Sequence, residues 1–201
     1  MTTETIQQTK SFGKMSALGK QAEKKYQEFF DAHNPKGWIL HDVSGIRAYQ
    51  NIDVDFVCQK NKDIPFEFER VFTDGGKNFV MIEVKYDGSA ERTGRPTGNL
   101  PFEIYNKGDW GWSAKTRADF AFVFTVDADY DAMEITKWHN MHRVNMKKWR
   151  DRIFSASGNG IVFTPTKPRV EREGKWFVDH LDKIDILKET GIIEKTWSVD
   201  W

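Results

Sequence analysis

Residues 78–87, NFVMIEVKYD, are rich in apolar, aromatic and β-branched side chains and follow the turn residues 74–76, which predicts a β-strand at the centre of the fold. Successive side chains of a strand point to opposite faces, so one face carries Phe79, Met81, Glu83 and Lys85. Both faces begin with apolar residues, as in a strand that is covered on both sides. A carboxylate and an ammonium on a covered face cost free energy unless they have a use. Glu83 and Lys85 are therefore the first candidates for function.

A helical spacing precedes this strand. Apolar residues recur every three or four positions between residues 16 and 30, which predicts an N-terminal helix that ends before Asn34. Residues 1–15 are polar, and we expect them to form a flexible arm. Glu23 lies in the middle of the helix among lysines, where a carboxylate is ordinarily a solvated residue paired with lysine.

Further strands are predicted over residues 37–41, 48–58, 67–72 and 118–126. A tight turn would join the 67–72 strand to the 78–87 strand as a hairpin. The resulting meander would bring Asp53 or Asp55 close to Glu83 and Lys85. The register that decides between them does not follow from the sequence.

A long segment rich in Gly, Thr and Arg, residues 88–101, follows the organising strand. Long irregular loops in compact domains are often functional. Arg92 and Arg95 lie in this loop, and their guanidinium groups suit phosphate contacts. Glu103 follows in a mostly apolar run and adds another carboxylate.

Residues 131–154 combine an apolar stripe with a basic face, which predicts a basic C-terminal helix. Arg143, Lys147 and Arg150 follow at helical spacing on the basic face, which suits a polyanion. The elements together predict an α/β fold, in which a mixed central β-sheet carries an N-terminal helix and this basic helix.

Two histidines lie in the same segment. His139 and His142 are three residues apart, a spacing that can hold a metal ion on a helix. No carboxylate motif accompanies them, so we interpret them as surface histidines of the basic face.

Composition narrows the class of protein. The 201 residues suit one domain, and we expect it over residues 16–201, with residues 127–201 as a helical and irregular extension of the core. Thirty basic and 30 acidic residues give no net charge, so a nucleic acid would need a local basic patch. The single Cys58 excludes an internal disulfide and a cysteine-cluster zinc site. No apolar run has the length of a membrane span, so we expect an intracellular protein without a membrane partner.

The ordered set of acids and lysine resembles the PD-(D/E)XK nuclease superfamily. Its parts are Glu23 in LGKQAEKKYQEFF, Asp55 in NIDVDFV, and Glu83-Val84-Lys85 in FVMIEVKYD. The runs TGNLPFE, GWS and ADF, between residues 97 and 120, are similar to small phage-encoded or Holliday-junction-resolvase-like members. The resemblance covers about residues 18–126. No proline precedes the aspartate, which leaves Asp53 or Asp55 as the ligand, and Asp55 fits the motif position better.

The resemblance implies a restriction-endonuclease-like core and a Mg²⁺- or Mn²⁺-dependent deoxyribonuclease, with an endonuclease favoured over an exonuclease. Hard divalent ions prefer oxygen ligands, which suits Asp55 and Glu83. The Val84 carbonyl and Glu103 would complete the metal ligands, and Glu23 would assist catalysis. Lys85 would orient the attacking water or stabilise charge on the phosphate. Branched DNA is a suitable substrate, and two symmetric cuts would need a homodimer.

Two other classes compete with this interpretation. A nucleic-acid-binding module with the same fold would use the acids only as a polar sheet edge. A metal-dependent hydrolase of small substrates is less favoured, because the sequence has no GxSxG or HExxH motif and no Gly-rich phosphate loop. Trp110 and Trp112 suit stacking on unpaired bases, although such residues are more often part of a hydrophobic turn.

Overall fold

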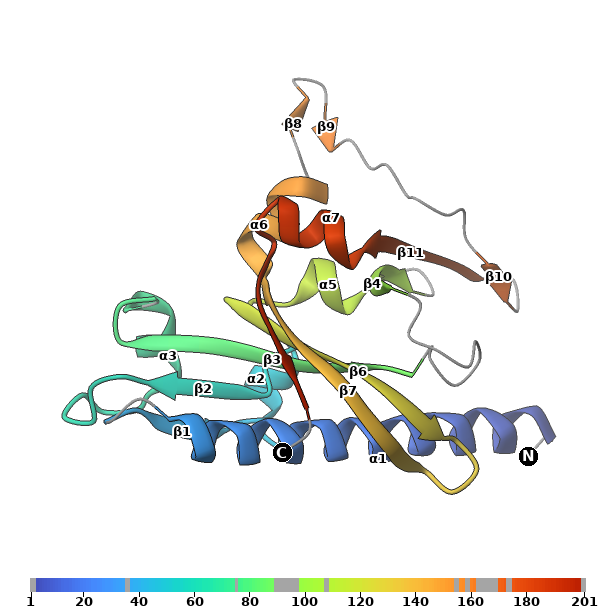
Figure 1. Cartoon of the computed structure of the whole chain (residues 1–201), viewed down its shortest axis with the longest axis horizontal. Helices are drawn as coiled ribbons and strands as arrows, with labels where there is room; N and C mark the ends of the chain where they lie inside the picture. The colour runs from blue at the N-terminus through green and yellow to red at the C-terminus, as the bar shows by residue number, and fades with distance from the viewer. Residues whose placement is uncertain are drawn as a thin grey trace.

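The computed structural model describes residues 3–34, 37–74, 76–88, 98–106, 109–153, 156–157, 160–161, 170–172 and 175–199. A mixed sheet with the strand order β1-β2-β3-β6-β7-β12 lies at its centre (Figure 1). Its strands are β1 (Ile39–Asp42), β2 (Phe56–Gln59), β3 (Phe79–Asp87), β6 (Phe120–Asp129), β7 (Glu134–Asn145) and β12 (Ile193–Ser198). β3 and β6 run parallel, and the other neighbours in this sheet are antiparallel. The predicted mixed α/β fold is confirmed.

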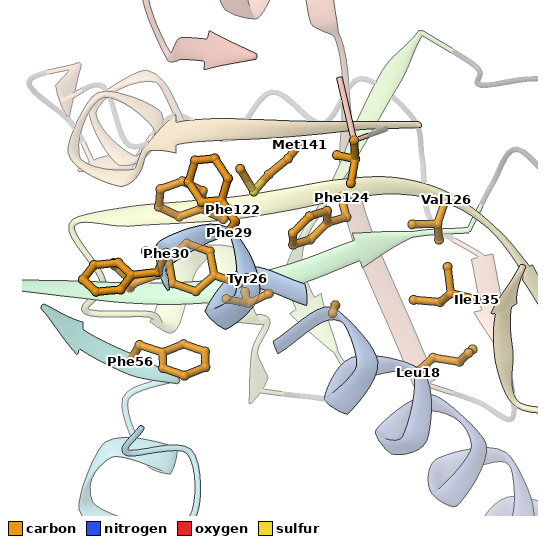
Figure 2. Close-up of a cluster of buried hydrophobic side chains, with 14 of the residues drawn as sticks. Leu18, Tyr26, Phe29, Phe30, Phe56, Phe122, Phe124, Val126, Ile135 and Met141 are labelled. Atoms are coloured by element: carbon orange, nitrogen blue, oxygen red, sulfur yellow. The ribbon is translucent and has the colours of Figure 1, made fainter. Parts of the chain in front are cut away.

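Helix α1 (Thr3–His33) covers one face of this sheet (Figure 1). The helical spacing of its apolar residues places one stripe of the helix against the sheet, where the ring of Tyr26 lies 4.6 Å from that of Phe122. The even-numbered residues Ile82 and Val84 of β3 belong to the same core. Figure 2 shows this core, which includes Leu18, Tyr26, Phe29, Phe30, Phe56, Phe122, Phe124, Val126, Ile135 and Met141.

The opposite face of the sheet is covered by short helices and a second sheet. The helices are α2 (Arg47–Gln50), α3 (Phe68–Thr73), α5 (Trp112–Lys115), α6 (Met146–Ile153) and α7 (Ile184–Glu189). The second sheet contains β10 (Val170–Arg172), β11 (Lys175–Lys183), β4 (Asn99–Asn106) and β5 (Asp109–Trp110), and β8 (Ala156–Ser157) pairs with β9 (Gly160–Ile161). Trp149 of α6 stacks on Phe102 of β4 with ring centres 3.9 Å apart, which anchors the second sheet to the core.

The N-terminal half of the chain departs from the prediction in three places. The helix begins at Thr3, so the expected arm over residues 1–15 is helical from that residue on. The expected 48–58 strand is reduced to β2, because α2 and a turn occupy its first part. The expected 67–72 strand is the helix α3, in which Val71 is buried. The neighbour of β3 is therefore β2, and the acidic segment lies directly beside Glu83 rather than one strand away.

The predicted basic C-terminal helix over residues 131–154 is wrong for most of its length. Residues 134–145 form β7, and only α6 is helical. The register of β7 against β6 shifts twice, at His139 and at Thr136, so apolar residues three apart, such as Ile135 and Trp138, share one face of the strand. A spacing of three between apolar residues is also typical of a helix, which is why this strand was predicted as one.

Residues 127–201 were expected to be a helical and irregular extension of the core, and their described part is less irregular than that because it contributes two long-range strand pairings. Both β7 and β12 are strands of the central sheet, and β12 pairs with β7 along Ile193–Ser198. The C-terminal part of the chain therefore completes the core. None of the described helices is long and apolar enough to cross a membrane.

Two glycines give a matched test of this packing. A Cβ on Gly111 would lie 2.5 Å from the carbonyl oxygen of Glu103, whereas a Cβ on Gly19 would meet nothing within 4 Å. We expect Gly111→Ala to lower the free energy of unfolding by about 1–3 kcal/mol, because β4 and α5 must separate. Gly19→Ala should raise it by about 0.5–1 kcal/mol through helix propensity. Urea denaturation measures both, and a neutral Gly111→Ala would contradict the close packing.

Candidate active site

Strand β3 carries a buried acid beside a partly exposed lysine. Glu83 is 1% exposed, and the side chain of Lys85 is 33% exposed. Both side chains lie on the face opposite α1, as the alternation predicts. Lys85 Nζ pairs with Glu83 Oε1, whereas Glu83 Oε2 is buried and has no hydrogen-bond partner among the described residues. A buried carboxylate oxygen without a donor is costly, and such atoms mark places where a ligand or a function uses them.

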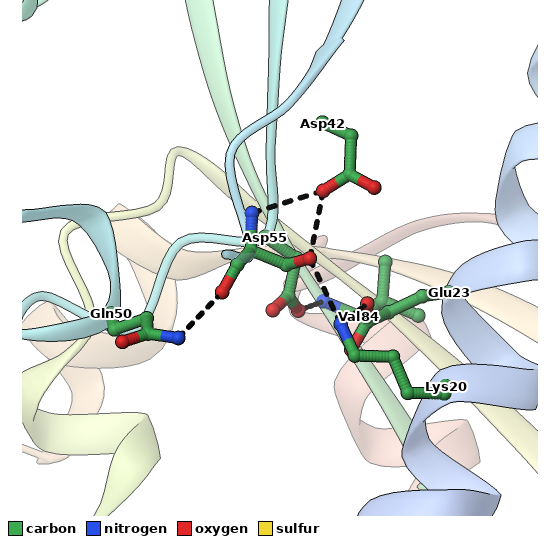
Figure 3. Close-up of polar contacts among 7 residues, drawn as sticks. Lys20, Glu23, Asp42, Gln50, Asp55 and Val84 are labelled. Atoms are coloured by element: carbon green, nitrogen blue, oxygen red, sulfur yellow. Dashed lines mark hydrogen bonds and ion pairs between the residues drawn. The ribbon is translucent and has the colours of Figure 1, made fainter. Parts of the chain in front are cut away.

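Asp55 is held on the edge of β3 by two hydrogen bonds. Its backbone N–H donates to the carbonyl of Ile82 at 2.9 Å. Its Oδ2 accepts the N–H of Val84 at 2.8 Å, as Figure 3 shows. Strand β2 pairs with β3 only as far as Ile82, through Phe56. The Asp55 carboxylate therefore takes the place that the carbonyl of a further strand residue would have in the ladder.

The backbone of β3 offers one more oxygen at this edge. The N–H and C=O of a strand residue point to the same side of the strand. Because the Val84 N–H points to Asp55, the Val84 carbonyl oxygen faces the same edge, beyond the last paired residue of β2. Asp55, Glu83 and Val84 thus contribute two carboxylates and one carbonyl to one region of the molecule.

The charges of this region are strongly coupled. Burial raises the pKa of Glu83 well above its ordinary value against the attraction of Lys85, and the Asp55 carboxylate raises it further. Burial also raises the pKa of Asp55, which Lys85 and the Val84 hydrogen bond oppose. Burial acts to lower the pKa of Lys85, but the attraction of Glu83 and Asp55 outweighs it, so this pKa is raised. Lys85 therefore stays an ammonium at neutral pH, and one cation serves two acids.

Glu23 approaches the same region from α1. Its side chain is 16% exposed and pairs with Lys20, whose Nζ also donates to Ser44 Oγ at 2.9 Å (Figure 3). Burial raises the pKa of Glu23, Lys20 opposes the rise, and the charge of Asp55 adds to it. The structure thus brings Glu23 into electrostatic contact with Asp55, and its role in catalysis stays a prediction.

Asp53 and Asp55, the two alternatives for the motif acid, have different surroundings. Asp53 has a positive φ of 48°, its carbonyl accepts a hydrogen bond from Thr116 Oγ1 at 2.6 Å, and its carboxylate lies 3.3 Å from Lys115 Nζ. Its charge reaches Glu83, but its carboxylate is tied to α5. The carboxylate of Asp55 is tied to the backbone of β3. The geometry therefore favours Asp55 as the partner of Glu83.

The remaining predicted ligand and the loop arginines are less well placed by the structure. Glu103 lies on β4, where its carbonyl accepts a hydrogen bond from Ser113 Oγ at 2.7 Å and its side chain lies against Gly111. Its metal-binding role stays a prediction. Arg92 and Arg95 lie outside the described residues.

Arg143, Lys147 and Arg150 do not form one basic helix face, so that prediction is wrong. Arg143 belongs to β7 and pairs with Glu194 at 3.1 Å. Lys147, on α6, pairs with Asp151 at 2.7 Å. Arg150 donates to the carbonyl of Thr116 at 2.9 Å. The three cations lie on two elements, and each has a local partner.

The two histidines are not surface residues of a helix either. His142 is buried on β7, its Nδ1 lies 2.9 Å from Thr196 Oγ1, and burial followed by the charge of Lys188 lowers its pKa to about 4. His139 Nε2 lies 3.0 Å from Asp127 Oδ1. His142 is thus a neutral core residue of the sheet.

Sequence reasoning missed Lys115 and Arg117. The pairing of Glu23 with a lysine of its own helix was expected, and Lys20, three residues earlier, is that lysine. Lys115 and Arg117 directly precede the buried strand β6, which runs parallel to β3. The residues just before β6 lie at the end of the sheet where β3 also begins, because the two strands are parallel. Their position directly before a buried strand was therefore the feature of the sequence that could have identified them.

No protein-family model matches the chain, and comparisons with curated proteins and with solved structures find no match. The resemblance to PD-(D/E)XK nucleases therefore stays a prediction.

Across the described parts of the chain, no three His, Cys, Asp or Glu side chains form a group that could hold a metal ion. The donor set at β3 is of another kind, since it combines two carboxylates with a backbone carbonyl.

Removal of the Lys85 charge tests the coupling of this site. In Lys85→Met, Glu83 becomes a buried carboxylate without its cation, and we expect a loss of about 1–3 kcal/mol of unfolding free energy near pH 8. This loss of unfolding free energy is smaller than that expected for a fully buried ion pair, because the Lys85 side chain is partly exposed. The folded-state pKa of Glu83 lies above its unfolded value, so its carboxylate costs stability as the pH rises and the cost disappears in acid.

Urea denaturation near pH 8 and near pH 5 measures this loss. The double variant Lys85→Met/Glu83→Gln, which removes the buried Glu83 charge together with its cation, is the control and should recover part of the stability near pH 8. An equal loss at both pH values would contradict the coupling.

Proposed function

We propose that this protein is a nuclease that hydrolyses phosphodiester bonds in DNA with the help of a divalent metal ion, as an endonuclease. The observation that carries the proposal is the meeting of Asp55, Glu83 and Lys85 at the edge of β3 that β2 leaves uncovered. Two buried acids with raised pKa values beside a lysine are a costly arrangement in a protein that makes no use of them.

The architecture supports a restriction-endonuclease-like core. Helix α1 packs on the sheet, the Glu-x-Lys pair lies on the central strand β3, and the aspartate precedes the neighbouring strand β2. This is the order of parts that the PD-(D/E)XK resemblance implies. We assign α1, β1 to β3 and β6 to this core, and β7 and β12 extend its sheet on the other side of β6.

The donor set fits Mg²⁺ or Mn²⁺. Asp55, Glu83 and the Val84 carbonyl offer only oxygen atoms, which these hard ions prefer, and Glu83 Oε2 is a buried acceptor without a donor among the described residues. When bound there, the ion supplies Lewis acidity and acidifies a coordinated water. It would also replace the protons that burial favours on Asp55 and Glu83.

Lys85 acts in this proposal as a fixed positive charge. Its raised pKa keeps the ammonium protonated at neutral pH, which excludes Lys85 as the general base. Its side chain is partly exposed, so its ammonium could donate a hydrogen bond to an attacking water or to a phosphate oxygen. Glu23 and Lys20 stand behind Asp55, where Glu23 is the candidate for a proton acceptor on the α1 side.

The substrate and the setting complete the proposal. DNA with branches or unpaired segments is the proposed substrate, and symmetric cutting of a junction would require two copies of the chain. We also infer action inside the cell, where the single buried Cys58 stays reduced.

A non-catalytic nucleic-acid-binding module is the second candidate. It is favoured by the ion pair of Lys85 with Glu83, which gives the acid a partner without any metal ion. Metal-dependent cleavage of DNA by the purified protein separates the two candidates.

Substitution of the β3 pair tests the nuclease. With Mg²⁺ and a panel of linear, nicked, flapped and four-way DNAs, we expect Glu83→Gln and Lys85→Ala to lower the cleavage rate by roughly 100-fold or more, since each removes charge stabilisation at the reacting phosphate. Asp55→Asn should have a similar effect, whereas Asp53→Asn should retain most activity. Gel mapping of the cut positions gives the rates and separates internal from terminal cleavage.

Glu69→Gln and Lys77→Ala are the controls, because both residues are exposed and lie outside the site. Circular dichroism confirms that each variant is folded. Unchanged turnover in folded Glu83→Gln would refute the assignment of this site.

Metal binding should depend on pH in a defined direction. Because burial raises the pKa values of Glu83 and Asp55, protons compete with the ion, and Mg²⁺ should stabilise the protein more near pH 8 than near pH 5.5. Thermal denaturation with Mg²⁺ and with EDTA measures the shift in Tm at each pH. Glu83→Gln should show almost no shift, and a shift independent of both pH and Glu83 would place the ion elsewhere.

A further inference from the structure

A basic pocket lies beside α5, on the same side of the sheet as Glu83 and Lys85. Its volume is about 340 Å³, and it is lined by Trp110, Ala114, Lys115, Thr116, Arg117 and Arg150. Sites for small ligands have volumes of roughly 300–1,000 Å³, so the pocket has room for one nucleotide. Three of the six lining residues are cations, and the described lining contains no acid.

The cations of this pocket are held close to each other. Arg150 is fixed by hydrogen bonds to the carbonyls of Thr116 at 2.9 Å and Ala118 at 3.4 Å. Burial, followed by repulsion from the charge of Arg117, lowers the pKa of Arg150, and Asp119 and Asp151 partly oppose this decrease. Within the described part of the chain, no acid forms a salt bridge with Arg117. A bound anion would relieve this repulsion, and guanidinium groups bind phosphate well.

Trp110 gives the pocket an aromatic wall. It is 48% exposed, which is unusual for the largest apolar side chain. Exposed aromatic rings beside cations form the stacking surfaces of proteins that bind single-stranded nucleic acids, since every base has a π-face. A phosphate-binding end and a stacking wall in one pocket match the two parts of a nucleotide.

The pocket is connected to the proposed active site through α5. Lys115 lies at the pocket and pairs with Asp53 at 3.3 Å, and the charge of Asp53 acts on Glu83 and Lys85. At the other end of α5, the ring of Trp112 lies 5.6 Å from Lys85 Nζ. A strand held at Lys85 could thus continue along α5 into the pocket.

We propose that this pocket binds one unpaired nucleotide of a DNA strand next to the cleavage site, with its base against Trp110 and its phosphate on Lys115 and Arg117. The proposal rests on the nuclease function given above and adds the substrate class, which is DNA with a single-stranded segment. A nucleotide in a closed duplex is stacked and paired and cannot enter such a pocket without being extruded.

Binding in EDTA tests the pocket independently of cleavage. The probes are a fluorescein-labelled oligothymidylate of about ten nucleotides, a length within the range of single-strand sites, and a fully paired, blunt-ended duplex of two strands. Fluorescence anisotropy with the full chain should show tighter binding of the single strand. Trp110→Leu and Arg117→Ala should each weaken it roughly tenfold, and Trp110→Phe, which keeps an aromatic ring, should retain most of the affinity.

Lys147→Ala is the matched control, because it removes an exposed cation of α6 that pairs with Asp151 outside the pocket. It should change the affinity by less than about twofold. Equal weakening in Lys147→Ala and Arg117→Ala would overturn the proposal in favour of diffuse charge attraction. Wild-type affinity in Trp110→Leu, or tighter binding of the blunt-ended duplex, would also overturn it.

The cleavage assay separates this inference from the proposed function. If the pocket variants cut flapped DNA at the wild-type rate and bind it with wild-type affinity, the pocket proposal is wrong and the nuclease stands. If no DNA is cut but Trp110→Leu and Arg117→Ala still lose single-strand binding, the pocket is supported and the nuclease is wrong.

Discussion

The site depends on the point at which β2 stops pairing with β3. If the pairing of β2 with β3 continued beyond the Phe56–Ile82 pair, a backbone carbonyl of β2 would accept the Val84 N–H and cover this edge of β3. Instead the chain turns at Asp53, and the Asp55 side chain accepts this hydrogen bond at 2.8 Å. The bond satisfies a buried donor and at the same time fixes a carboxylate beside Glu83. Rigid placement on strands is what a catalytic group needs, because small displacements are costly in rate.

The electrostatics of the region follow from this placement. Two acids and one lysine gather in a volume from which water is largely excluded, so each charge affects the protonation of the others. Lys85 supplies one positive charge for these two carboxylates. Glu23 and Lys20 form an ion pair on the α1 side, where the charge of Lys20 opposes the rise in the pKa of Asp55 and the charge of Asp55 raises the pKa of Glu23.

The sequence predicted those elements whose periodicity was undisturbed. The alternation of β3 placed Glu83 and Lys85 on one face correctly, and the buried run of β6 was recognisable from its continuous apolar residues. β7 was predicted as a helix because its two irregularities against β6 give apolar residues a spacing of three. No local propensity reports a bulge, since the extra residue is defined only by the partner strand. α3 was mistaken for a strand because a run of six residues is too short to show its period.

The contacts of Asp53 and Lys85 with α5 could not be predicted from the sequence, because they join residues that are far apart along the chain. Lys115 reaches Asp53, and Trp112 reaches Lys85, across more than 25 positions of sequence, so only the tertiary fold brings them together. α5 contacts Asp53 through Lys115 and Lys85 through Trp112, and Lys115 also lines the basic pocket. If the pocket binds a DNA strand as proposed, the same helix would help to position that strand near the acids. Recognition of an unpaired nucleotide and placement of the reacting phosphate would then be one event, which would give a nuclease selectivity for substrate structure without base-specific contacts.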